Sequence, residues 1–368
     1  DFSEQDALRV KKIERACRHD VKAAERFLCE RWQSYPFVHP YLSFIHFGLT
    51  SEDVNNIAYG LCIQRALVQM IAPTLDECMR ILRTLQKRWK VVKLLALTHG
   101  QPATPTTVGK EFLVFAERLR LQVRALRTFR MQGKFGGAVG NFAAHYAAYP
   151  AVDWGIFGRQ FLRSFHLIPL TYTTQINPHD DLAELSHILV RINTIFLDCS
   201  RDMWLYIMRG ILRQKIVKGE VGSSTMPHKV NPIDFENAEG NLGISTALFH
   251  HFAEKLPVSR LQRDLSDSTV QRNIGVAFGH HLLAVKSLLR GLSRIDVDRE
   301  ICARELKEHP EVCTEALQIL LRRFGEHDAY ERVRKLTRGK KVTEANLRKI
   351  IRRSKIPVEA QERISEFL

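Results

Sequence analysis

Apolar residues recur every three or four positions along most of the chain, which is the pattern of helices with one buried face. The first such stripe runs from Ile63 to Leu85, and others cover 192–211, 242–252 and 276–292. Pro73 lies inside the first stripe, so we expect a kink or a break there. Strand-like alternation is confined to short pieces such as 170–176. The pattern predicts an all-α protein with long helices.

Length and composition are those of an ordinary globular protein. The 368 residues are 45% hydrophobic and 26% charged, which excludes disordered and collagen-like classes, and the length suggests two or three domains. No apolar run is long enough to span a bilayer. The seven cysteines form no CxxC pair, which favours a reducing compartment; we expect the cytoplasm, with an organelle left open. The chain opens at Asp1 rather than at a methionine, so we expect it to be a fragment.

The formal net charge of +15 is unevenly distributed. Residues 322–353 carry twelve basic side chains against four acidic ones. Such an excess is compatible with a nucleic-acid footprint, but no aromatic pattern or recognition helix accompanies it. We therefore favour a solvated helix face and expect no nucleic-acid partner. A basic protein also attracts small anionic substrates.

Four irregular segments rich in Gly, Pro, Ser, Thr and His separate the stripes, and functional residues usually lie on such loops. The first contains residues 18–20 and, further on, Thr50 and Ser51. Thr50 with Asp53 has the sequence of a capping box. Because a helix N-terminus presents free N–H groups, this stretch is able both to cap a helix and to bind an anion. The residues alone leave the two roles open.

The second segment, 98–105, contains Gly100, Pro102 and Pro105, which exclude a regular helix. We expect His99 on a rigid turn before a helix that begins near Thr106. Histidine exchanges protons near neutral pH, so His99 is a candidate acid or base. A hydrogen-bonded structural histidine would have the same sequence pattern.

The third segment, 219–232, combines glycines, hydroxyl residues and a lysine, and predicts a mobile loop that runs into a helix. Asn231 is expected as the N-cap and Pro232 as the first helical residue. Lys229 and nearby N–H groups are suited to stabilise an anion, although a flexible linker remains the alternative. In the fourth segment, 259–273, two arginines nine residues apart are able to grip a phosphate or to form a salt-bridged helix surface.

The third segment carries a resemblance to a known family. Its sequence GSSTMPHKVNP, residues 222–232, resembles the signature loop of the fumarase/aspartase superfamily of β-elimination enzymes. Other segments resemble the adenylosuccinate lyase branch with bacterial-type sequences: THGQPATP at 98–105, GAVGN at 137–141, DFEN at 234–237, and the residues around 263–269. The likeness runs from about residue 7 to about residue 342.

The resemblance implies a carbon–nitrogen lyase of purine biosynthesis. Such enzymes cleave adenylosuccinate to AMP and fumarate, and also release fumarate from the succinylated aminoimidazole carboxamide ribotide, without a metal or an organic cofactor. By the same resemblance Ser223 is the general base and His99 the general acid. Glu236 matches a carboxylate that keeps the acid protonated, and His19 matches a second histidine near the substrate.

The resemblance also assigns to substrate binding residues of the first, third and fourth segments, together with Gln175 and Asn237. They are Arg18, Asp20, Thr50, Ser51, Gln175, Ser224, Lys229, Val230, Asn231, Asn237, Arg263, Ser268, Thr269 and Arg272. Lys229 and Asn231 would stabilise the charge that builds on a substrate carboxylate, while Arg263, Ser268 and Arg272 would bind the phosphate. Arg18 departs from the family pattern, which has asparagine there, and adds a cation beside the substrate.

The architecture implied by the resemblance is a three-domain, all-α fold. Residues 1–39 would be the end of an N-terminal domain, 40–292 a central long-helix domain, and 293–368 a small C-terminal domain. The central helices of four subunits would form one bundle, so that each active site of the homotetramer draws loops from three subunits.

Three alternatives remain open at this point. A different lyase of the superfamily, such as argininosuccinate lyase, would share the signature loop, although the two arginines of 259–273 favour a phosphorylated substrate. A helical metal phosphohydrolase is suggested by the His-Asp pairs at 19–20, 179–180 and 327–328. A non-enzymatic nucleic-acid binder would rest on the charge of 322–353 alone.

Overall fold

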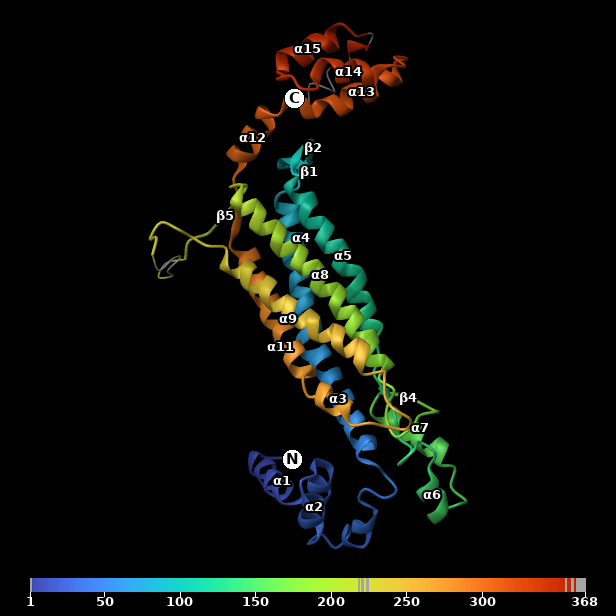
Figure 1. Ribbon diagram of the computed structural model, residues 1–368. Coiled ribbons are helices and arrows are strands. Elements are labelled where there is room, and N and C mark those ends of the chain that lie inside the picture. Colours follow the sequence, from blue (N-terminus) through green and yellow to red (C-terminus); the bar gives the residue numbers. More distant parts are fainter. Residues whose placement is uncertain are drawn as a thin grey trace. The chain divides into compact units, whose positions relative to one another are not determined.

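The computed structural model describes residues 2–217, 219, 222, 225–354, 356–358 and 361 (Figure 1). Helices dominate it, so the predicted all-α class is confirmed. The shorter helices before residue 180 are α1 (Glu4–Cys17), α2 (Asp20–Trp32), η1 (His39–Phe44), α3 (Ser51–Ala66), η2 (Leu67–Ile71), α6 (Ala143–Ala148) and α7 (Trp154–Ser164). The long helices are α4 (Ala72–Arg88), α5 (Val108–Thr128), α8 (Asp180–Met208), α9 (Ile233–Lys255) and α11 (Ile274–Ser293).

The remaining elements are short. Six strands pair into three two-stranded sheets within the described residues: β1 (Lys93–Thr98) with β2 (Gln101–Thr107), β3 (Gln132–Gly133) with β4 (Ile168–Pro169), and β5 (Leu212–Gln214) with β6 (Ile295–Val297). The other helices are α10 (Ser266–Gln271), α12 (Arg299–Glu308), η3 (Pro310–Cys313), α13 (Thr314–Arg323), α14 (Ala329–Thr337) and α15 (Glu344–Arg352).

The first apolar stripe is interrupted by a π-helical turn, as Pro73 led us to expect. The Ala72 N–H donates to the Leu67 carbonyl, five residues back, within η2. Proline lacks the N–H that an α-helical bond to residue 69 would need, so the turn widens just before it. A π-helical turn contains one residue more than an α-helical turn, and this shifts the buried face of the helix. Ile71 is fully buried, whereas its neighbour Met70, an apolar residue of the first stripe, is 47% exposed.

His99 lies at the tip of a β-hairpin that the sequence pattern did not predict as strands. His99 and Gly100 both have left-handed backbones, with φ of 53° and 74°, as a two-residue hairpin turn between β1 and β2 requires. The predicted rigid turn is thus confirmed. The following helix begins at Val108 rather than near Thr106, because β2 continues to Thr107.

The segment 170–176 does not form a strand, so the alternation there was misleading. Tyr172 is 93% exposed, and no neighbouring strand pairs with the segment in the described structure. Its polar groups serve other purposes: the Gln175 amide nitrogen donates to the Ala138 carbonyl at 2.9 Å.

The described chain divides into two compact units, and each is treated by itself below. Unit 1 contains residues 1–75, 122–194 and 241–282, and unit 2 contains 76–121, 195–240 and 283–368. The boundaries between them fall inside the five long helices.

In unit 1 a buried polar network fastens three long helices together. The His281 imidazole of α11 donates through Nδ1 to Asn193 Oδ1 of α8 at 2.6 Å, and Asn193 Nδ2 donates to Ser245 Oγ of α9 at 3.1 Å. Ser245 in turn donates to the Ala277 carbonyl on α11. These hydrogen bonds connect α8, α9 and α11 through side chains that are buried, as buried polar groups generally require.

In unit 2 ion pairs join the same helices. Arg290 of α11 pairs with Asp234 of α9 at 2.6 Å, and Arg201 of α8 pairs with Glu239 of α9 at 2.8 Å. In the basic C-terminal part, α14 and α15 carry internal pairs such as Arg334–Glu331 and Arg348–Glu344, as on a solvated helix face. None of the helices in the described part of the chain is long and apolar enough to cross a membrane.

Candidate functional site

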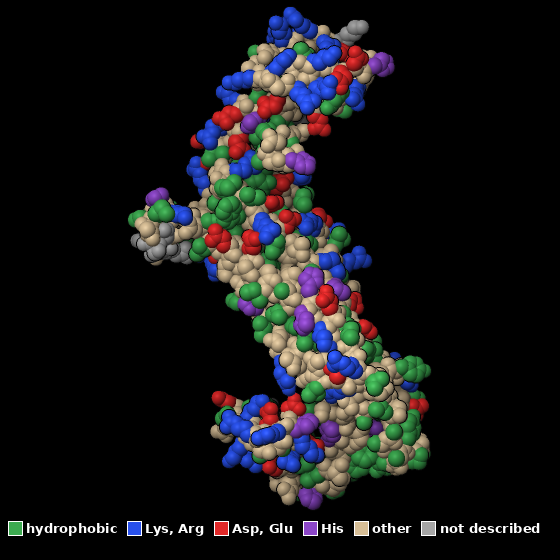
Figure 2. Space-filling model, in the orientation of Figure 1, with side chains coloured by type: hydrophobic (Ala, Val, Ile, Leu, Met, Phe, Trp, Pro, Cys, Tyr) green, Lys and Arg blue, Asp and Glu red, His purple; other side chains and the backbone are tan. Residues whose placement is uncertain are grey.

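A pocket of about 520 Å³ in unit 1 is lined by eight of the candidate residues, which come from the first and the fourth irregular segments. Five cationic side chains face only two carboxylates in its wall, so the pocket attracts anions. Figure 2 shows Lys and Arg side chains gathered over α1 and α2. The lining residues are Lys11, Glu14, Arg15, Arg18, His19, Asp20, Ser51, Asn55, Arg263, Leu265, Ser268, Thr269 and Arg272.

The turn between α1 and α2 supplies Arg18, His19 and Asp20. Arg18 ends α1 in a left-handed conformation with φ of 54°, and its N–H donates to the Glu14 carbonyl. His19 caps α2, where its Nδ1 accepts the Lys22 N–H at 3.2 Å. A neutral imidazole that accepts at Nδ1 carries its proton on Nε2, which lies 3.4 Å from Ser51 Oγ. The cap thus aims the N–H of His19 at the start of α3.

The start of α3 is fixed by the predicted capping box. Thr50 and Asp53 cap each other, with the Thr50 N–H donating to Asp53 Oδ2 at 2.9 Å. Asp53 also accepts the N–H groups of Gly136 and Gly137 at 2.9 and 3.0 Å. Thr50 therefore acts as a cap beside the pocket, while its neighbour Ser51 faces the pocket.

Lys134 neutralises the buried carboxylate of Asp53. Its Nζ lies 2.7 Å from Asp53 Oδ1, and both side chains are almost fully buried. Burial lowers the pKa of Lys134, and the Asp53 charge opposes this shift. The pair joins α3 to the GAVGN segment, which the sequence marked only through its resemblance.

The fourth segment forms the other wall of the pocket. Arg263 donates through Nη1 to Gln175 Oε1 at 3.2 Å, so Gln175 orients the arginine without itself lining the pocket. The Asp264 carboxylate accepts the Ser266 N–H and hydroxyl, which holds the pKa of Asp264 down at about 2 and fixes the turn into α10. Ser268, Thr269 and Arg272 follow on α10 and its C-cap.

The remaining candidates lie in unit 2. His99 is exposed at its hairpin tip. Glu236, in the first turn of α9, accepts the Trp204 indole N–H at 3.1 Å; among the described contacts it has none with His99. Asn237 donates to Ser287 Oγ at 2.7 Å. The expected support of His99 by Glu236 is therefore still a prediction.

The loop before α9 contributes a smaller pocket of about 80 Å³, whose wall includes Val230 and Asn231. The helix begins one residue later than expected: the Pro232 carbonyl accepts the Glu236 N–H, and Asn231 instead donates to the Gly222 carbonyl at 3.2 Å. Asn231 is therefore not the N-cap. Lys229 is exposed. Ser223 and Ser224 lie outside the described residues.

Sequence reasoning missed one face of α1. Lys11, Glu14 and Arg15 line the pocket together with Arg18, and Asn55 joins Ser51 from one turn further along α3. These spacings of three and four residues put side chains on one face of a helix. That periodicity was readable, but only the structure shows that this face lines a pocket together with residues of α3 and α10.

No group of three His, Cys, Asp or Glu side chains in the described part of the chain has a geometry that could hold a metal ion. His179, from one of the His-Asp pairs, is buried and lies 2.8 Å from the side-chain amide nitrogen of Gln271. All seven cysteines are free thiols.

Comparisons with known proteins agree over the whole chain. A family model described as "Lyase" matches residues 1–244, and one described as "Adenylosuccinate lyase C-terminal" matches 259–368. The chain is 49% identical to the adenylosuccinate lyase of Legionella pneumophila (strain Corby) over 367 residues, covering 100% of this chain and 80% of that protein. The Escherichia coli (strain K12) adenylosuccinate lyase is 47% identical over 363 residues, covering 99% and 80%.

A eukaryotic relative and a solved structure extend the comparison. The adenylosuccinate lyase of Dictyostelium discoideum is 48% identical over 364 residues, covering 97% of this chain and 78% of that protein. The fold is similar to that of 3-carboxy-cis,cis-muconate lactonizing enzyme from Pseudomonas putida, with a TM-score of 0.75 at 20% identity, covering 98% of this chain and 78% of that one. These relatives favour a lyase over the metal phosphohydrolase.

Proposed function

The chain belongs to the adenylosuccinate lyase family, and we propose from this premise that it cleaves adenylosuccinate to AMP and fumarate. It also releases fumarate from the succinylated aminoimidazole carboxamide ribotide, in which the same succinyl group is attached to nitrogen. Both reactions belong to purine biosynthesis.

The cationic pocket of unit 1 is the observation that supports a phosphorylated substrate. Lys11, Arg15, Arg18, Arg263 and Arg272 line it together with the hydroxyl groups of Ser51, Ser268 and Thr269. Guanidinium groups bind phosphate through paired hydrogen bonds, and hydroxyls complete such a site. A nucleotide with a 5′-phosphate suits this lining, whereas argininosuccinate has no phosphate.

The chemistry is an elimination that needs one base and one acid. Ser223 takes a proton from the carbon next to a carboxylate of the succinyl group, and negative charge builds on that carboxylate. Lys229 and Asn231 stabilise this charge, since electrostatic stabilisation of a developing anion is usually the largest contribution to catalysis. The carbon–nitrogen bond then breaks, its electron pair leaves with the nitrogen, and His99 gives that nitrogen a proton. Glu236 keeps His99 protonated, because a nearby negative charge favours the charged imidazole.

The active form is a homotetramer in which each site combines loops from three subunits, with the three domains divided at residues 39 and 292. Apolar side chains exposed on three of the long helices support this assembly: Leu121 is 55%, Ile244 50% and Leu283 57% exposed. A second copy of the chain would cover such surfaces. The seven free thiols support a location in the cytoplasm.

The test is a turnover assay with a chelator present. Purified enzyme mixed with adenylosuccinate should release fumarate and AMP in equal amounts, and argininosuccinate should give no fumarate. A folded tetramer that leaves adenylosuccinate intact would contradict the proposal.

A further inference from the structure

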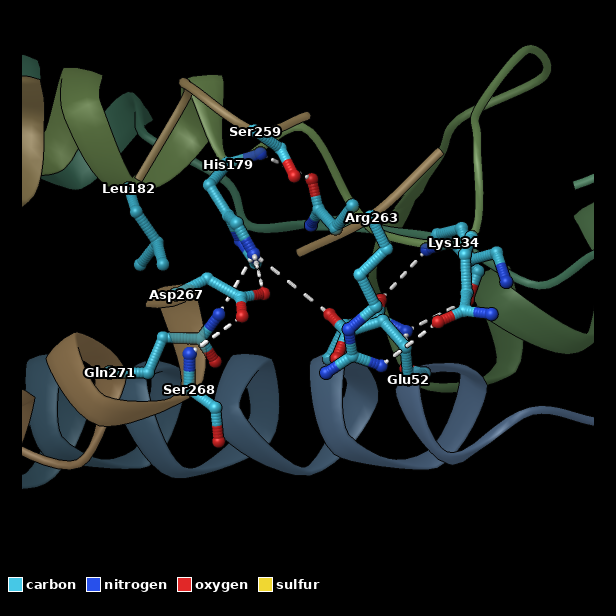
Figure 3. Close-up of polar contacts among 12 residues, drawn as sticks. Glu52, Lys134, His179, Leu182, Ser259, Arg263, Asp267, Ser268 and Gln271 are labelled. Atoms are coloured by element: carbon cyan, nitrogen blue, oxygen red, sulfur yellow. Dashed lines mark hydrogen bonds and ion pairs between the residues drawn. The ribbon is translucent and has the colours of Figure 1, made fainter. Parts of the chain in front are cut away.

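Three groups that accept hydrogen bonds converge directly behind the cationic pocket of unit 1 (Figure 3). The His179 Nε2 lies 3.9 Å from Glu52 Oε1 and 4.0 Å from Asp267 Oδ2. Glu52 comes from the first turn of α3, His179 precedes α8, and Asp267 lies on α10. Each of the three residues is no more than 3% exposed. Solvent therefore does not satisfy these groups.

No hydrogen of the described residues is donated to two carboxylate oxygens of the cluster. The Gln271 amide nitrogen donates to His179 Nε2 at 2.8 Å, which makes that ring nitrogen an acceptor and the imidazole neutral. Glu52 Oε1 and Asp267 Oδ2 are buried and have no hydrogen-bond partner among the described residues. Leaving a buried polar group unpaired costs about 1–3 kcal/mol, and more when it is charged.

The charges around the cluster do not balance either. Asp53 and Lys134 pair with each other, which leaves the carboxylates of Glu52 and Asp267 against the single guanidinium of Arg263. The charged and titratable groups that face Glu52 are Asp53 and Tyr59 on its own helix, Lys134 after β3, His179 before α8, Arg263 before α10 and Asp267 on α10. With a neutral His179, one negative charge is in excess.

We infer that Glu52, His179 and Asp267 form a site for one proton behind the pocket. This site is partly occupied in the free protein, and a phosphate-bearing ligand increases its occupancy when it binds. The inference rests on the proposed function only for the identity of that ligand. Ser51 and Ser268, which line the pocket, are the chain neighbours of Glu52 and Asp267, so the ligand and the cluster share one wall. The proton comes from solvent, and the only bond formed is an O–H on a carboxylate.

Glu52 is the group that accepts the proton. Burial raises the pKa of Glu52 to about 7, although the positive charge of Arg263 opposes the shift, whereas burial and Arg263 lower the pKa of His179 to about 4. The proton is therefore partly present near neutral pH. A bound dianion adds like charge on the far side of Arg263 and raises the proton affinity of Glu52 further. Glu52 is thus a positioning residue that keeps Arg263 available to the ligand.

Calorimetric titration with AMP at pH 7.5, in two buffers of different ionisation enthalpy, measures the proton uptake. At this pH the phosphate of AMP is already largely dianionic. The wild type should take up about half a proton per AMP if the ligand raises the pKa of Glu52 by about one unit. Glu52→Gln, which has the same shape but cannot titrate, should take up none. The control is Glu77→Gln, the same substitution at an exposed position of α4, and it should take up as much proton per AMP as the wild type.

Equal proton uptake by the wild type and Glu52→Gln, or none by either, would overturn the inference. If Glu52→Gln does not fold, Asp267→Asn removes the same unit of charge and should abolish the uptake as well. If AMP does not bind the wild type, the proposed function fails. The titration is then repeated with inorganic sulfate, which is dianionic throughout, and the same difference in proton uptake between the wild type and Glu52→Gln is expected. A wild type that binds neither anion would also overturn the inference.

Discussion

Asp53 and Lys134 form a buried ion pair at 2.7 Å that connects the start of α3 to the backbone of the glycine-rich segment 136–140. The pair also fixes the start of the helix that presents Ser51 to the cationic pocket, because Asp53 forms the capping box with Thr50. A residue pair with no part in the proposed chemistry thus determines where a pocket side chain lies.

Breaking this pair should destabilise the fold strongly. Lys134→Met leaves the Asp53 carboxylate buried without its counter-ion, and removing one partner of a buried pair costs about 3–5 kcal/mol. The free energy of unfolding, measured with urea, should fall by that amount. Lys22→Met, in the exposed pair with Glu25, is the matched control and should change it by less than about 1 kcal/mol. Similar losses in both variants would show that Lys134 does not neutralise a buried charge.

Arg18→Asn should raise stability and weaken anion binding at the same time. Arg18 has a left-handed backbone, which asparagine tolerates better, so the α1–α2 turn should gain about 0.5–1 kcal/mol. The substitution also removes one of five cations from the pocket. Thermal unfolding and AMP titration measure the two effects. A higher melting temperature with unchanged AMP affinity would show that Arg18 does not contribute to the anion site.

His281 should make the fold sensitive to acid. Burial lowers its pKa to about 4 from the usual 6.5, so the folded protein keeps this histidine neutral where the unfolded chain is protonated. The contribution is complete above pH 6.5 and is lost as the pH falls toward 4, by roughly 3 kcal/mol. The difference in unfolding free energy between the wild type and His281→Gln should therefore shrink over that interval. His250→Gln, at an exposed position of α9, should show no such trend; a flat difference for His281→Gln too would contradict the buried neutral state.

Ser223→Ala should bind adenylosuccinate and fail to turn it over. A general base contributes about 10²–10⁴-fold to the rate, whereas the cationic pocket that binds the substrate is unchanged. Binding is measured by calorimetry and turnover by fumarate release. If the variant retained most of the rate, Ser223 would not be the base.

Local sequence patterns predicted the long helices, the capping box of Thr50 and Asp53 and the rigid turn at His99. Each of these depends on neighbouring residues only. The β-hairpin at 93–107 was missed because its apolar positions do not alternate, and 170–176 was misread because alternation alone cannot supply a partner strand.

The pocket itself depends on contacts between distant parts of the chain. Arg263, Ser268 and Arg272 were predicted together because they lie within one segment. The structure shows that His19 and Ser51, which were predicted from another segment, line the same pocket. The pocket-lining role of the α1 face and the Glu52–His179–Asp267 cluster were not predicted, since both depend on residues that are distant in the sequence coming together. The division into three domains and the catalytic pairing of Glu236 with His99 remain predictions.

The most direct test is the initial rate of fumarate release from adenylosuccinate, measured with AMP or adenosine as inhibitor. The enzyme should release fumarate, and AMP should inhibit at least about 100-fold more strongly than adenosine, because two charge-assisted contacts to the phosphate provide about 3 kcal/mol or more. Arg263→Gln and Arg272→Gln should reduce that difference. Absence of fumarate, or equal inhibition by AMP and adenosine, would contradict a nucleotide lyase whose phosphate site is the cationic pocket.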